Sequence, residues 1–408
     1  MGQYEVAILG SGPAGLALAG ELVRRGTRVI CISPEIHQTW RHNYGVWGHE
    51  LGEILKNVVD VSWDAPSIWT GPDEKVLAAR YCRIHTPSLQ RNLKESAVSM
   101  GLVCVEGLVE RIDHDADGST VRLSDGQQIS ARFVVDATGQ KGGFIDRKSD
   151  EELAFQTAYG QVLEGVSLAL FEGEMIFMDL RSLPGDDEFS SPTFLYAMTL
   201  GPNRIFVEET SLISAPEMPI SVLQDRLKLR LETLGIDPAG TPVDEERCRF
   251  PLNLSMPKLG QRTLGFGLAA GMVHPASGYQ LARTLGMVES VASAICDGLT
   301  GHDIDAESAR IWRAIWPKDD VMKWELFSFG SRFLQTLSPE ETRHFFEAFF
   351  SLPDVDWQGY LSGTTSMSHV ASVMAKVFYR LGPTLRWKVM RQGANLRGLS
   401  LLTTAVSR

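Results

Sequence analysis

Two adjacent glutamates, Glu208 and Glu209, interrupt an otherwise apolar, strand-like run from Asn203 to Thr210. Consecutive strand residues point to opposite faces, so at most one of the two can easily face a given pocket. Burial raises the pKa of a carboxyl group and suits it to general acid catalysis, whereas a nearby arginine lowers it. The pattern indicates a candidate acid or base in a dry site. The alternative is that both residues are structural acids at the strand end.

Other polar residues of the chain offer related chemistry. Asp179 is a further candidate catalytic acid, although a salt bridge with Arg181 on the same strand face accounts for it at least as well. His274 stands between glycines and a proline and is interpreted as a hydrogen-bonded structural histidine rather than a proton shuttle. The five cysteines are widely spaced and form no CxxC or zinc-type pattern, so we expect neither disulfides nor a metal site.

The N-terminal glycine motif predicts dinucleotide binding. Gly10-Ser11-Gly12-Pro13-Ala14-Gly15 follows an apolar strand pattern and opens a helix of small residues, and a second strand pattern follows at residues 28–32. The first glycine permits a tight turn, the second lets backbone amides approach a pyrophosphate, and the third lets helix and strand come close together. The helix N-terminus then faces the phosphates. Ribose contacts are expected from Ser33 or Glu35, although Glu35 is equally interpreted as a loop carboxylate.

Two later segments resemble the FAD-contacting loops of known flavoproteins. Residues 133–139 read as a strand ending in Asp136-Ala137-Thr138-Gly139, which resembles the second FAD loop of glutathione-reductase-like enzymes; an ordinary strand and turn is the alternative. Residues 267–278 are similar to the GDAAHxxxPxxG segment of p-hydroxybenzoate-hydroxylase-like enzymes, with Leu268 in place of its aspartate. The resemblance implies flavin contacts at Gly271, Met272, Gly278 and Tyr279.

These residues require an α/β fold with discontinuous units. We expect a glutathione-reductase/p-hydroxybenzoate-hydroxylase-like FAD-binding Rossmann fold, a substrate sheet domain and C-terminal helices. The expected FAD-binding domain comprises residues 1–47, 76–150 and 260–300, and the substrate domain residues 48–75 and 151–259. Residues 301–408 form a helical region. Ser338-Pro339-Glu340-Glu341 predicts a capped helix start there, and the aromatic-rich run from Trp324 to Phe350 indicates either a core or an apolar lining.

Four short motifs together resemble plant and bacterial FAD-dependent lycopene cyclases. They occur in that family's order between residue 4 and about residue 300: Asn43-Tyr44-Gly45-Val46-Trp47, Phe177-Met178-Asp179-Leu180-Arg181, Phe206-Val207-Glu208-Glu209-Thr210, and Gly271-Met272-Val273-His274-Pro275 continued by Gly278-Tyr279. The departure at Leu268 is expected in this family, whose members also lack that aspartate.

The resemblance implies cyclisation of the end groups of lycopene or a similar acyclic polyene to γ- or β-carotene, without net redox change. It implies Glu208 as the acid/base and Glu209 as an orienting or second catalytic group. It further implies FAD, active in its reduced form, with NADPH or NADH as reductant. The alternatives are a flavin monooxygenase or polyprenyl reductase of the same superfamily, a cyclase for another polyene, or a non-enzymatic prenyl-lipid carrier.

The charge distribution divides the chain into an acidic body and a basic tail. The last acid is Asp356; residues 357–408 carry seven Lys or Arg and no acid, against 32 basic and 50 acidic residues before them. The acidic body argues against nucleic-acid binding, whereas the basic, apolar tail suits an anionic membrane surface. No signal peptide or spanning helix is expected. We therefore predict a peripheral membrane protein on the cytoplasmic side; the alternative is that the tail simply packs on the body.

Overall fold

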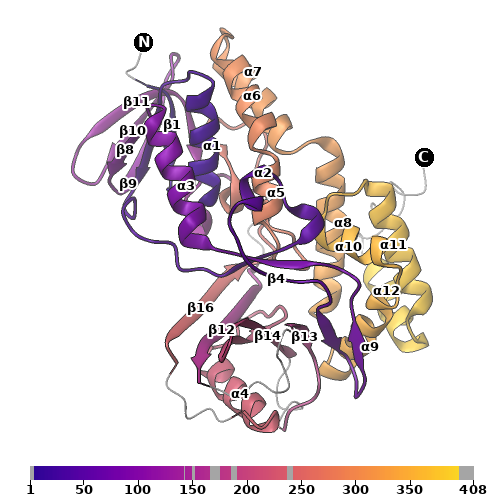
Figure 1. The fold of residues 1–408 in the computed structure, drawn as a ribbon. Coiled ribbons are helices and arrows are strands. Elements are labelled where there is room, and N and C mark those ends of the chain that lie inside the picture. The colour runs from indigo at the N-terminus through magenta and orange to yellow at the C-terminus, as the bar shows by residue number, and fades with distance from the viewer. Residues whose placement is uncertain are drawn as a thin grey trace.

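The computed structural model describes residues 4–141, 143–148, 152–165, 175–184, 191–236 and 242–394. Within these ranges, three β-sheets and a group of C-terminal helices form the fold (Figure 1). One large sheet lies with the N-terminal helices, the other lies below it in this view, and the C-terminal helices lie to one side of both. The architecture confirms the expected α/β fold.

The first sheet has seven strands in the order β8-β2-β1-β11-β10-β9, and β17 pairs with the end of β11. Strands β1, β2, β8, β11 and β17 pair in parallel, whereas β9, β10 and the start of β11 pair antiparallel. The bounds are β1 Tyr4–Leu9, β2 Val29–Ser33, β8 Val103–Glu106, β9 Val109–His114, β10 Ser119–Leu123, β11 Gln128–Asp136 and β17 Leu264–Gly265. The expected opening of strand, helix and strand is confirmed.

Alternation along β1 divides the core of this sheet. Val6 and Ile8 belong to a cluster with helical residues, and Ala7 and Leu9 belong to a second cluster with the β10 residue Val121. Because side chains alternate along a strand, each face of the sheet is buried against a different layer. The helices that contribute to the first cluster are α1 Pro13–Arg24, α3 Thr86–Ser99, α5 Leu281–Gly286, α6 Val288–Leu299 and α7 Ile304–Ile315.

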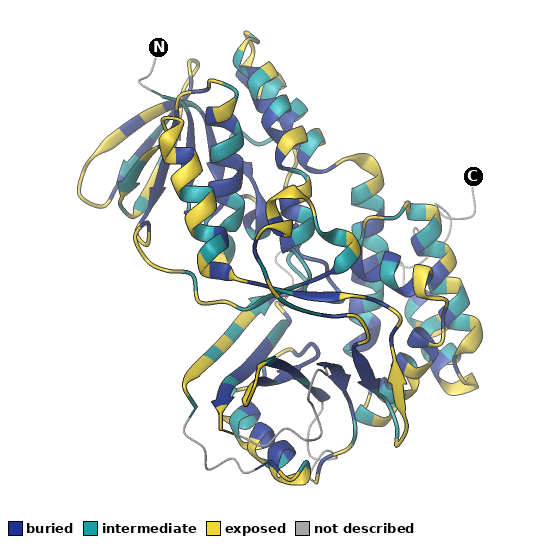
Figure 2. Cartoon of the chain, in the orientation of Figure 1, coloured by how far each residue is buried: buried dark blue, intermediate teal, exposed yellow. Residues whose placement is uncertain are grey.

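The second large sheet has the order β16-β12-β15-β14-β13-β5-β6. Helix α4, Ile220–Thr233, covers one face, and β13 and β14 are buried along most of their length (Figure 2). The predicted second sheet over residues 155–209 is confirmed. Its strands are β5 Ser67–Trp69, β6 Glu74–Val76, β12 Phe155–Glu164, β13 Met175–Asp179, β14 Thr193–Gly201, β15 Arg204–Ser211 and β16 Asp244–Pro251.

A small third sheet connects the two large ones along the chain. It has the order β3-β7-β4, with bounds Tyr44–Trp47, Tyr81–Ile84 and Val59–Trp63. Between β3 and β4 lie the short helices η1, Gly48–Glu50, and α2, Glu53–Lys56. The predicted domain boundaries at residues 47 and 76 fall within or beside this sheet, and the domain division stays a prediction.

The C-terminal region is helical, as expected. Its helices are α8 Lys318–Leu334, α9 Pro339–Phe350, α10 Asp354–Ser362, α11 Met367–Arg380 and α12 Pro383–Gly393. Ser338 and Glu341 form the predicted capping box of α9. Phe346, Phe349 and Phe350 are buried in a core shared with the second sheet, which favours the core interpretation of the aromatic-rich run. Within the described residues, no helix combines the length and apolarity needed to cross a bilayer.

Candidate active site

The glycine motif forms a turn between β1 and the start of α1. Gly10 has φ +100°, and a Cβ there would lie 2.5 Å from the carbonyl oxygen of Ala137. A Cβ on Gly15 would lie 2.1 Å from the carbonyl oxygen of Gly10, so the helix can approach the strand only with glycine here. Gly12 differs from both: nothing lies within 4 Å of its Cβ position. Pro13 and Ala14 then begin the helix, leaving open space beside its N-terminus.

The second predicted loop follows β11, which lies beside β1 in parallel. Asp136 is fully buried, and its Oδ1 accepts hydrogen bonds from the amide and hydroxyl groups of Thr138 at 2.9 and 2.7 Å. Burial raises the pKa of Asp136. Its Oδ2 has no hydrogen-bond partner among the described residues. Gly139 follows with φ +76°. The buried Oδ2 is an acceptor available to a ligand hydroxyl group.

The third predicted loop meets the first two. β17 pairs with Val135 and Asp136, and a Cβ on Gly267 would lie 2.7 Å from the Ala14 side chain. Gly271 has φ +72°, and the buried sulfur of Met272 accepts a hydrogen bond from the Gly267 amide at 3.2 Å. The carboxyl ends of parallel strands are where α/β sheets bind their ligands. All three predicted loops therefore converge at one edge of the first sheet.

The ribose candidates lie at the end of the neighbouring strand β2. Ser33 is buried and its hydroxyl group accepts a hydrogen bond from the Glu35 amide at 3.2 Å, whereas Glu35 is exposed. Their placement beside β1 fits the predicted ribose position. Their contact with a cofactor stays a prediction.

Glu208 lies on β15, in register with Gly160 of β12 and Tyr196 of β14. Its side chain is half-buried and accepts a hydrogen bond from the Thr210 hydroxyl group at 2.8 Å. Burial is the main cause that raises the pKa of Glu208 to about 8, the charge of Glu246 adds to the effect, and the Thr210 hydrogen bond opposes it. A carboxyl group with a raised pKa is suited to general acid catalysis.

Aromatic rings extend from Glu208 across the interface between the second sheet and the C-terminal helices. The Trp47 ring lies 4.9 Å from Tyr81, 4.9 Å from Phe177 and 5.1 Å from Trp357 of α10, centroid to centroid. All four side chains are buried. These packed rings exclude water from the region.

Three tyrosine hydroxyl groups link this wall to the third predicted cofactor loop. Tyr81 accepts hydrogen bonds from Tyr196 and from Tyr279, each at 3.2 Å between oxygens. Tyr196 is the cross-strand neighbour of Glu208, and Tyr279 directly follows Gly278. A Cβ on Gly278, which has φ +76°, would lie 2.8 Å from Gln156 Oε1. The three hydroxyl groups therefore connect β14, the strand next to Glu208, with the third loop at the edge of the first sheet.

A second carboxyl group lies on the same face of the second sheet. Glu246 of β16 is opposite Gly160, and Glu208 is opposite Gly160 from the other side, so the two glutamates flank one glycine. Cross-strand neighbours in register share a face. A Cβ on Gly160 would lie 2.7 Å from the Phe206 ring and 3.3 Å from the Glu208 Cβ. Glycine at this position makes room for the Phe206 ring beside the acid.

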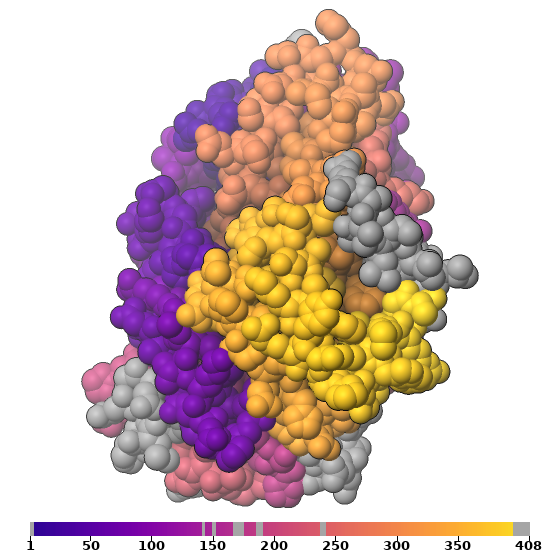
Figure 3. Space-filling view, turned by 90° about the vertical axis from the view of Figure 1, so that its right-hand side faces the viewer, coloured from indigo at the N-terminus to yellow at the C-terminus, as the bar shows by residue number. Residues whose placement is uncertain are grey.

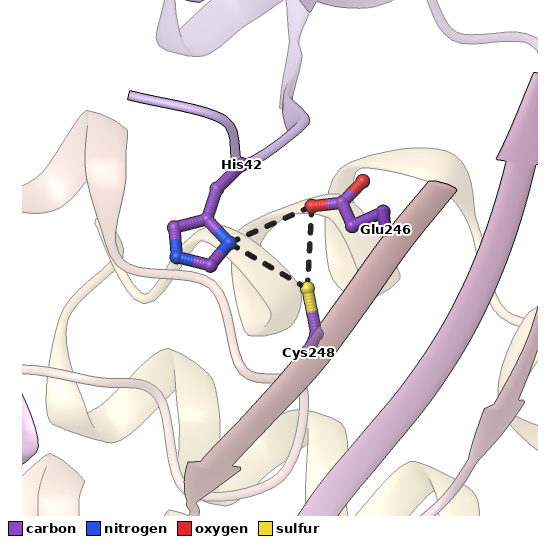
Figure 4. A group of neighbouring side chains, drawn as sticks. All are labelled: His42, Glu246 and Cys248. Atoms are coloured by element: carbon purple, nitrogen blue, oxygen red, sulfur yellow. Dashed lines mark hydrogen bonds and ion pairs between the residues drawn. The ribbon is translucent and has the colours of Figure 1, made fainter. Parts of the chain in front are cut away.

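Glu246 forms a group with His42 and Cys248 (Figure 4). Its Oε1 accepts hydrogen bonds from the Asn43 amide at 2.8 Å and the Cys248 thiol at 3.2 Å, and lies 3.7 Å from His42 Nδ1. These atoms are also close enough to share a cation. Burial and the two glutamates raise the pKa of the Cys248 thiol, so it keeps its proton and donates to Glu246. We interpret the group as hydrogen-bonded; the expectation of no metal stays a prediction.

Glu209 lies on the opposite face of the second sheet from Glu208. It is fully buried against α4, where Arg230 donates to both of its oxygens at 3.1 and 3.0 Å and Thr193 also donates. Arg226 lies 3.9 Å away. The structure therefore does not bring the two adjacent glutamates together. The contacts of Glu209 with Arg230 and Arg226 are those of a structural ion pair.

Asp179 also lies apart from Glu208. It is buried and shares a bidentate ion pair with Arg181, at 2.7 Å for the shortest contact. Its β-bridge partner Leu195 also pairs with Glu209, and Arg230 donates to the Arg181 carbonyl oxygen at 2.8 Å. The predicted salt bridge is confirmed, and Asp179 belongs with Glu209 on the α4 face.

Several site residues were not predicted from the sequence: Glu50, Tyr81, Tyr196 and Glu246. Burial raises the pKa of Glu50 to about 7, and this residue accepts a hydrogen bond from the Trp47 amide. Its position three residues after the Asn43–Trp47 motif was an available signal. The other three depend on strand pairing, which no local pattern reveals.

The interpretation of His274 can be compared directly with the structure. Both ring nitrogens of His274 have partners: Tyr360 O at 3.1 Å, and the amides of Ala276 and Ser277. Burial lowers the pKa of His274 to about 3, so the ring is neutral. Arg283 pairs with Asp320 at 3.4 Å. The structural interpretation of His274 is confirmed.

Several solved structures share the fold of this chain. A geranylgeranyl bacteriochlorophyll reductase-like protein from Thermoplasma acidophilum matches with a TM-score of 0.71 at 14% identity, over 95% of this chain and 99% of that chain. Halogenase PltM, solved with phloroglucinol and FAD, matches with a TM-score of 0.63 at 15% identity, over 99% and 94%. The chain shares its fold with these two proteins, one of which was solved with FAD.

Sequence comparison then assigns the family. A family model described as "Lycopene cyclase protein" matches residues 5–385. The lycopene beta cyclase of Synechococcus elongatus is 36% identical over 411 residues, which cover 99% of each chain. The chain belongs to the lycopene cyclase family, and the resemblance inferred from its motifs is confirmed.

The contacts of Glu209 predict a stability effect at Arg230. Replacing Arg230 by methionine removes the bidentate partner of Glu209 and leaves the buried Glu209 carboxylate poorly compensated. We therefore expect the free energy of unfolding to fall by about 3 kcal/mol or more. Urea denaturation followed by circular dichroism measures the effect. Arg247→Met removes an exposed ion pair with Glu245 and serves as the control, with an expected loss below about 1 kcal/mol. An Arg230→Met protein as stable as the control would contradict the structural role.

Proposed function

We propose that the protein is a lycopene beta-cyclase, an intramolecular lyase that closes rings at the ends of lycopene or a similar acyclic polyene to give γ- or β-carotene. One observation carries the proposal: in a chain of the lycopene cyclase family, Glu208 lies opposite Tyr196 on a strand pair from which buried aromatic rings extend through Tyr81 to Trp47, and burial raises the pKa of its carboxyl group. A hydrocarbon substrate offers its double bonds for reaction, and a ring closure that gives an isomer can begin with addition of a proton to one of them.

The proposed reaction conserves atoms and electrons. The carboxyl group of Glu208 adds a proton to the terminal double bond and leaves a tertiary cation. The neighbouring internal double bond attacks that cation, which forms the new carbon–carbon bond of a six-membered ring. A proton then leaves the carbon next to the new cation and returns to the Glu208 carboxylate. The product is an isomer of the substrate, and no electrons are gained or lost.

The surroundings of Glu208 suit a cationic intermediate. Trp47, Tyr81 and Phe177 present buried rings, whose π faces attract a positive charge. Once Glu208 has donated its proton, its carboxylate faces the cation in an environment of low polarity, where the attraction is stronger than in water. The same burial excludes water that would quench the cation.

We further propose FAD as the cofactor. The open space beside Gly12 suits a pyrophosphate, and the unpartnered Asp136 Oδ2 suits a hydroxyl group of the cofactor. Reduced flavin, when bound, would supply a negative charge or a proton near the cation. We assign its binding to residues at the ends of β1, β2, β11 and β17: Gly10, Gly12, Pro13, Ala14, Gly15, Ser33, Glu35, Asp136, Gly139, Gly271, Met272, Gly278 and Tyr279. NADPH or NADH is proposed as the reductant.

Contact with a membrane surface is proposed for helices α11 and α12, because lycopene dissolves in lipid. These helices form one outer face of the molecule (Figure 3). Tyr379, Trp387 and Met390 are 72%, 56% and 54% exposed there, and Arg391 lies over the Trp387 ring at 5.4 Å. Aromatic side chains beside arginines suit the interface of an anionic bilayer.

The cations of the basic tail do not all support this contact. Lys376 pairs with Asp356 at 2.7 Å, and Lys388 pairs with Glu341 at 2.6 Å. These pairs support the alternative in which the tail packs on the acidic body. We therefore assign the proposed lipid contact to the exposed apolar side chains together with Arg380 and Arg391, rather than to the lysines.

Flavin binding is expected to depend on Gly12. The Gly12 backbone, at φ −73° and ψ 179°, accepts a side chain, so Gly12→Val should fold but should obstruct the pyrophosphate. We expect flavin affinity to fall at least about tenfold, or about 1.4 kcal/mol. Absorbance of the purified protein measures flavin content. Gly52→Val is a matched control, because Gly52 is also a helix N-cap with similar angles and open space. Equal flavin content in the two variants would contradict the assignment.

Ring formation is expected to require Glu208. In Glu208→Gln the side chain keeps its size but loses its acidic proton, and general acid catalysis typically contributes about 10² to 10⁴ in rate. Expression in lycopene-accumulating bacteria, followed by chromatography and mass spectrometry of the pigments, measures the loss. Glu164→Gln, at an exposed site on β12, is the control. Normal cyclic carotene from the Glu208 variant would refute the role of Glu208. A product of the unsubstituted protein that is heavier than the substrate by two hydrogens or one oxygen would indicate a reductase or monooxygenase instead.

Membrane binding is expected to depend on the exposed apolar side chains of α11 and α12. Replacing Tyr379, Trp387 and Met390 by serine removes apolar surface worth more than about 1.4 kcal/mol, so partition into anionic vesicles should fall at least tenfold. Val355→Ser, at an exposed site on α10, is the control. Sedimentation with phosphatidylglycerol vesicles measures partition. Undiminished binding by the folded triple variant would refute the lipid contact.

A further inference from the structure

Two carboxyl groups on one sheet face need an explanation, because only one of them donates the proton in the proposed function. Glu208 and Glu246 are both in register with Gly160, on opposite sides of it. Adjacent strands lie about 4.8 Å apart, so the two glutamates are separated by roughly two strand spacings at the backbone. No side chain stands on the glycine between them, and like charges at such a site resist joint ionisation.

The polar contacts of Glu246 differ from those of Glu208. Glu246 accepts hydrogen bonds from the Asn43 amide and the Cys248 thiol, and His42 lies beside it (Figure 4). Glu208 accepts one hydrogen bond, from Thr210. An ionised carboxylate acts only as an acceptor, so the Glu246 surroundings suit the charged form. The neighbouring Glu246 carboxylate in turn raises the pKa of His42.

The carboxylate of Glu246 is held in place by the loop before β3, which is itself bound to β7. Asn43, whose amide donates to Glu246, also accepts a hydrogen bond from Arg83 Nε of β7 at 2.8 Å. The loop before β3 therefore connects the small sheet to β16. This arrangement fixes the Glu246 carboxylate in place, instead of leaving it a mobile surface acid.

We propose that Glu246 is a positioning residue for the acid: its negative charge, across Gly160, keeps the proton on Glu208 until substrate is present. This inference rests on the proposed function. After proton donation both carboxylates are charged, and together they face the cation. The return of a proton to Glu208 then relieves the repulsion between them, which favours completion of the cycle.

Other titratable groups surround the pair and must be considered with it. Tyr81 and Tyr196 face Glu208 from β7 and β14, and burial raises the pKa of both phenols, so they stay neutral near pH 8. Tyr44 and Cys248 face Glu246 and also stay neutral, because burial raises the pKa of each. His42 Nδ1 lies 3.7 Å from Glu246, which raises the pKa of His42, and a protonated His42 would oppose the charge of Glu246. Glu50, whose pKa burial raises to about 7, acts on Tyr81, and Arg83 donates to Asn43 beside Glu246. Among these groups, Glu246 is the one whose charge raises the pKa of Glu208.

Infrared titration of the full-length purified protein tests the proposal without using turnover. A protonated carboxyl group gives a carbonyl stretching band in the infrared spectrum. The band that is lost in Glu208→Gln is assigned to Glu208. We expect its midpoint near pH 8 in the unsubstituted protein. In Glu246→Gln, which keeps an acceptor for the Asn43 amide, we expect the midpoint to fall by about one pH unit or more, a tenfold loss of proton affinity. Glu245→Gln, on the same strand but exposed, should leave it unchanged.

The conservative variant separates charge from structure. Glu246→Asp keeps the charge, so its midpoint should lie closer to that of the unsubstituted protein than to that of Glu246→Gln. With active enzyme, the alkaline limit of ring formation should move with the midpoint. An unchanged midpoint in folded Glu246→Gln, or equal shifts in the Asp and Gln variants, would overturn the proposal. Absence of ring formation by the unsubstituted protein would refute the proposed function but leave the titration result intact.

Discussion

A carboxyl group in an apolar wall is the constraint on which the rest of the site depends. Burying a charge without a partner is too costly for a protein, so such a group either pairs with a cation or keeps its proton. Glu208 and Glu209 show both solutions at consecutive positions. Glu209 turns toward α4 and contacts Arg230, whereas Glu208 turns toward aromatic rings and pairs with no cation among the described residues. The two-residue period of the strand thus separates a structural ion pair from the proposed proton donor.

The fold holds this acid by contributions from three sheets. The second sheet provides Glu208, Glu246 and Tyr196, the small sheet provides Tyr81, and the loop after the first sheet's last strand provides Tyr279. No single unit contains the whole site. The hydrogen bonds among the tyrosines join the strand next to the acid to the edge at which the glycine loops converge, where we propose that FAD binds.

The sequence predicted the local features and not the long-range ones. The glycine loops, the strand ending at Asp136 and the capping box at Ser338 depend on neighbouring residues, and the structure contains all of them. Period-two alternation separated Glu208 from Glu209 but could not say which one faced the site. Glu246 could not be recognised at all, since its role depends on β16 and β15 both pairing with β12 at Gly160. The aromatic-rich run of α9 was ambiguous for a similar reason, because burial depends on which sheet covers it.

Gly160 shows how strand register can control chemistry. A side chain there would collide with the ring of Phe206, so glycine allows that ring to lie beside the acid and to lower the polarity around it. The same glycine leaves no side chain of its own between Glu208 and Glu246. Low polarity strengthens both the repulsion between two carboxylates and the attraction of either for a cation. In the proposed reaction, such a site holds the proton of Glu208 when empty and stabilises positive charge once that proton has moved to the hydrocarbon, and the absence of a side chain at Gly160 contributes to both effects.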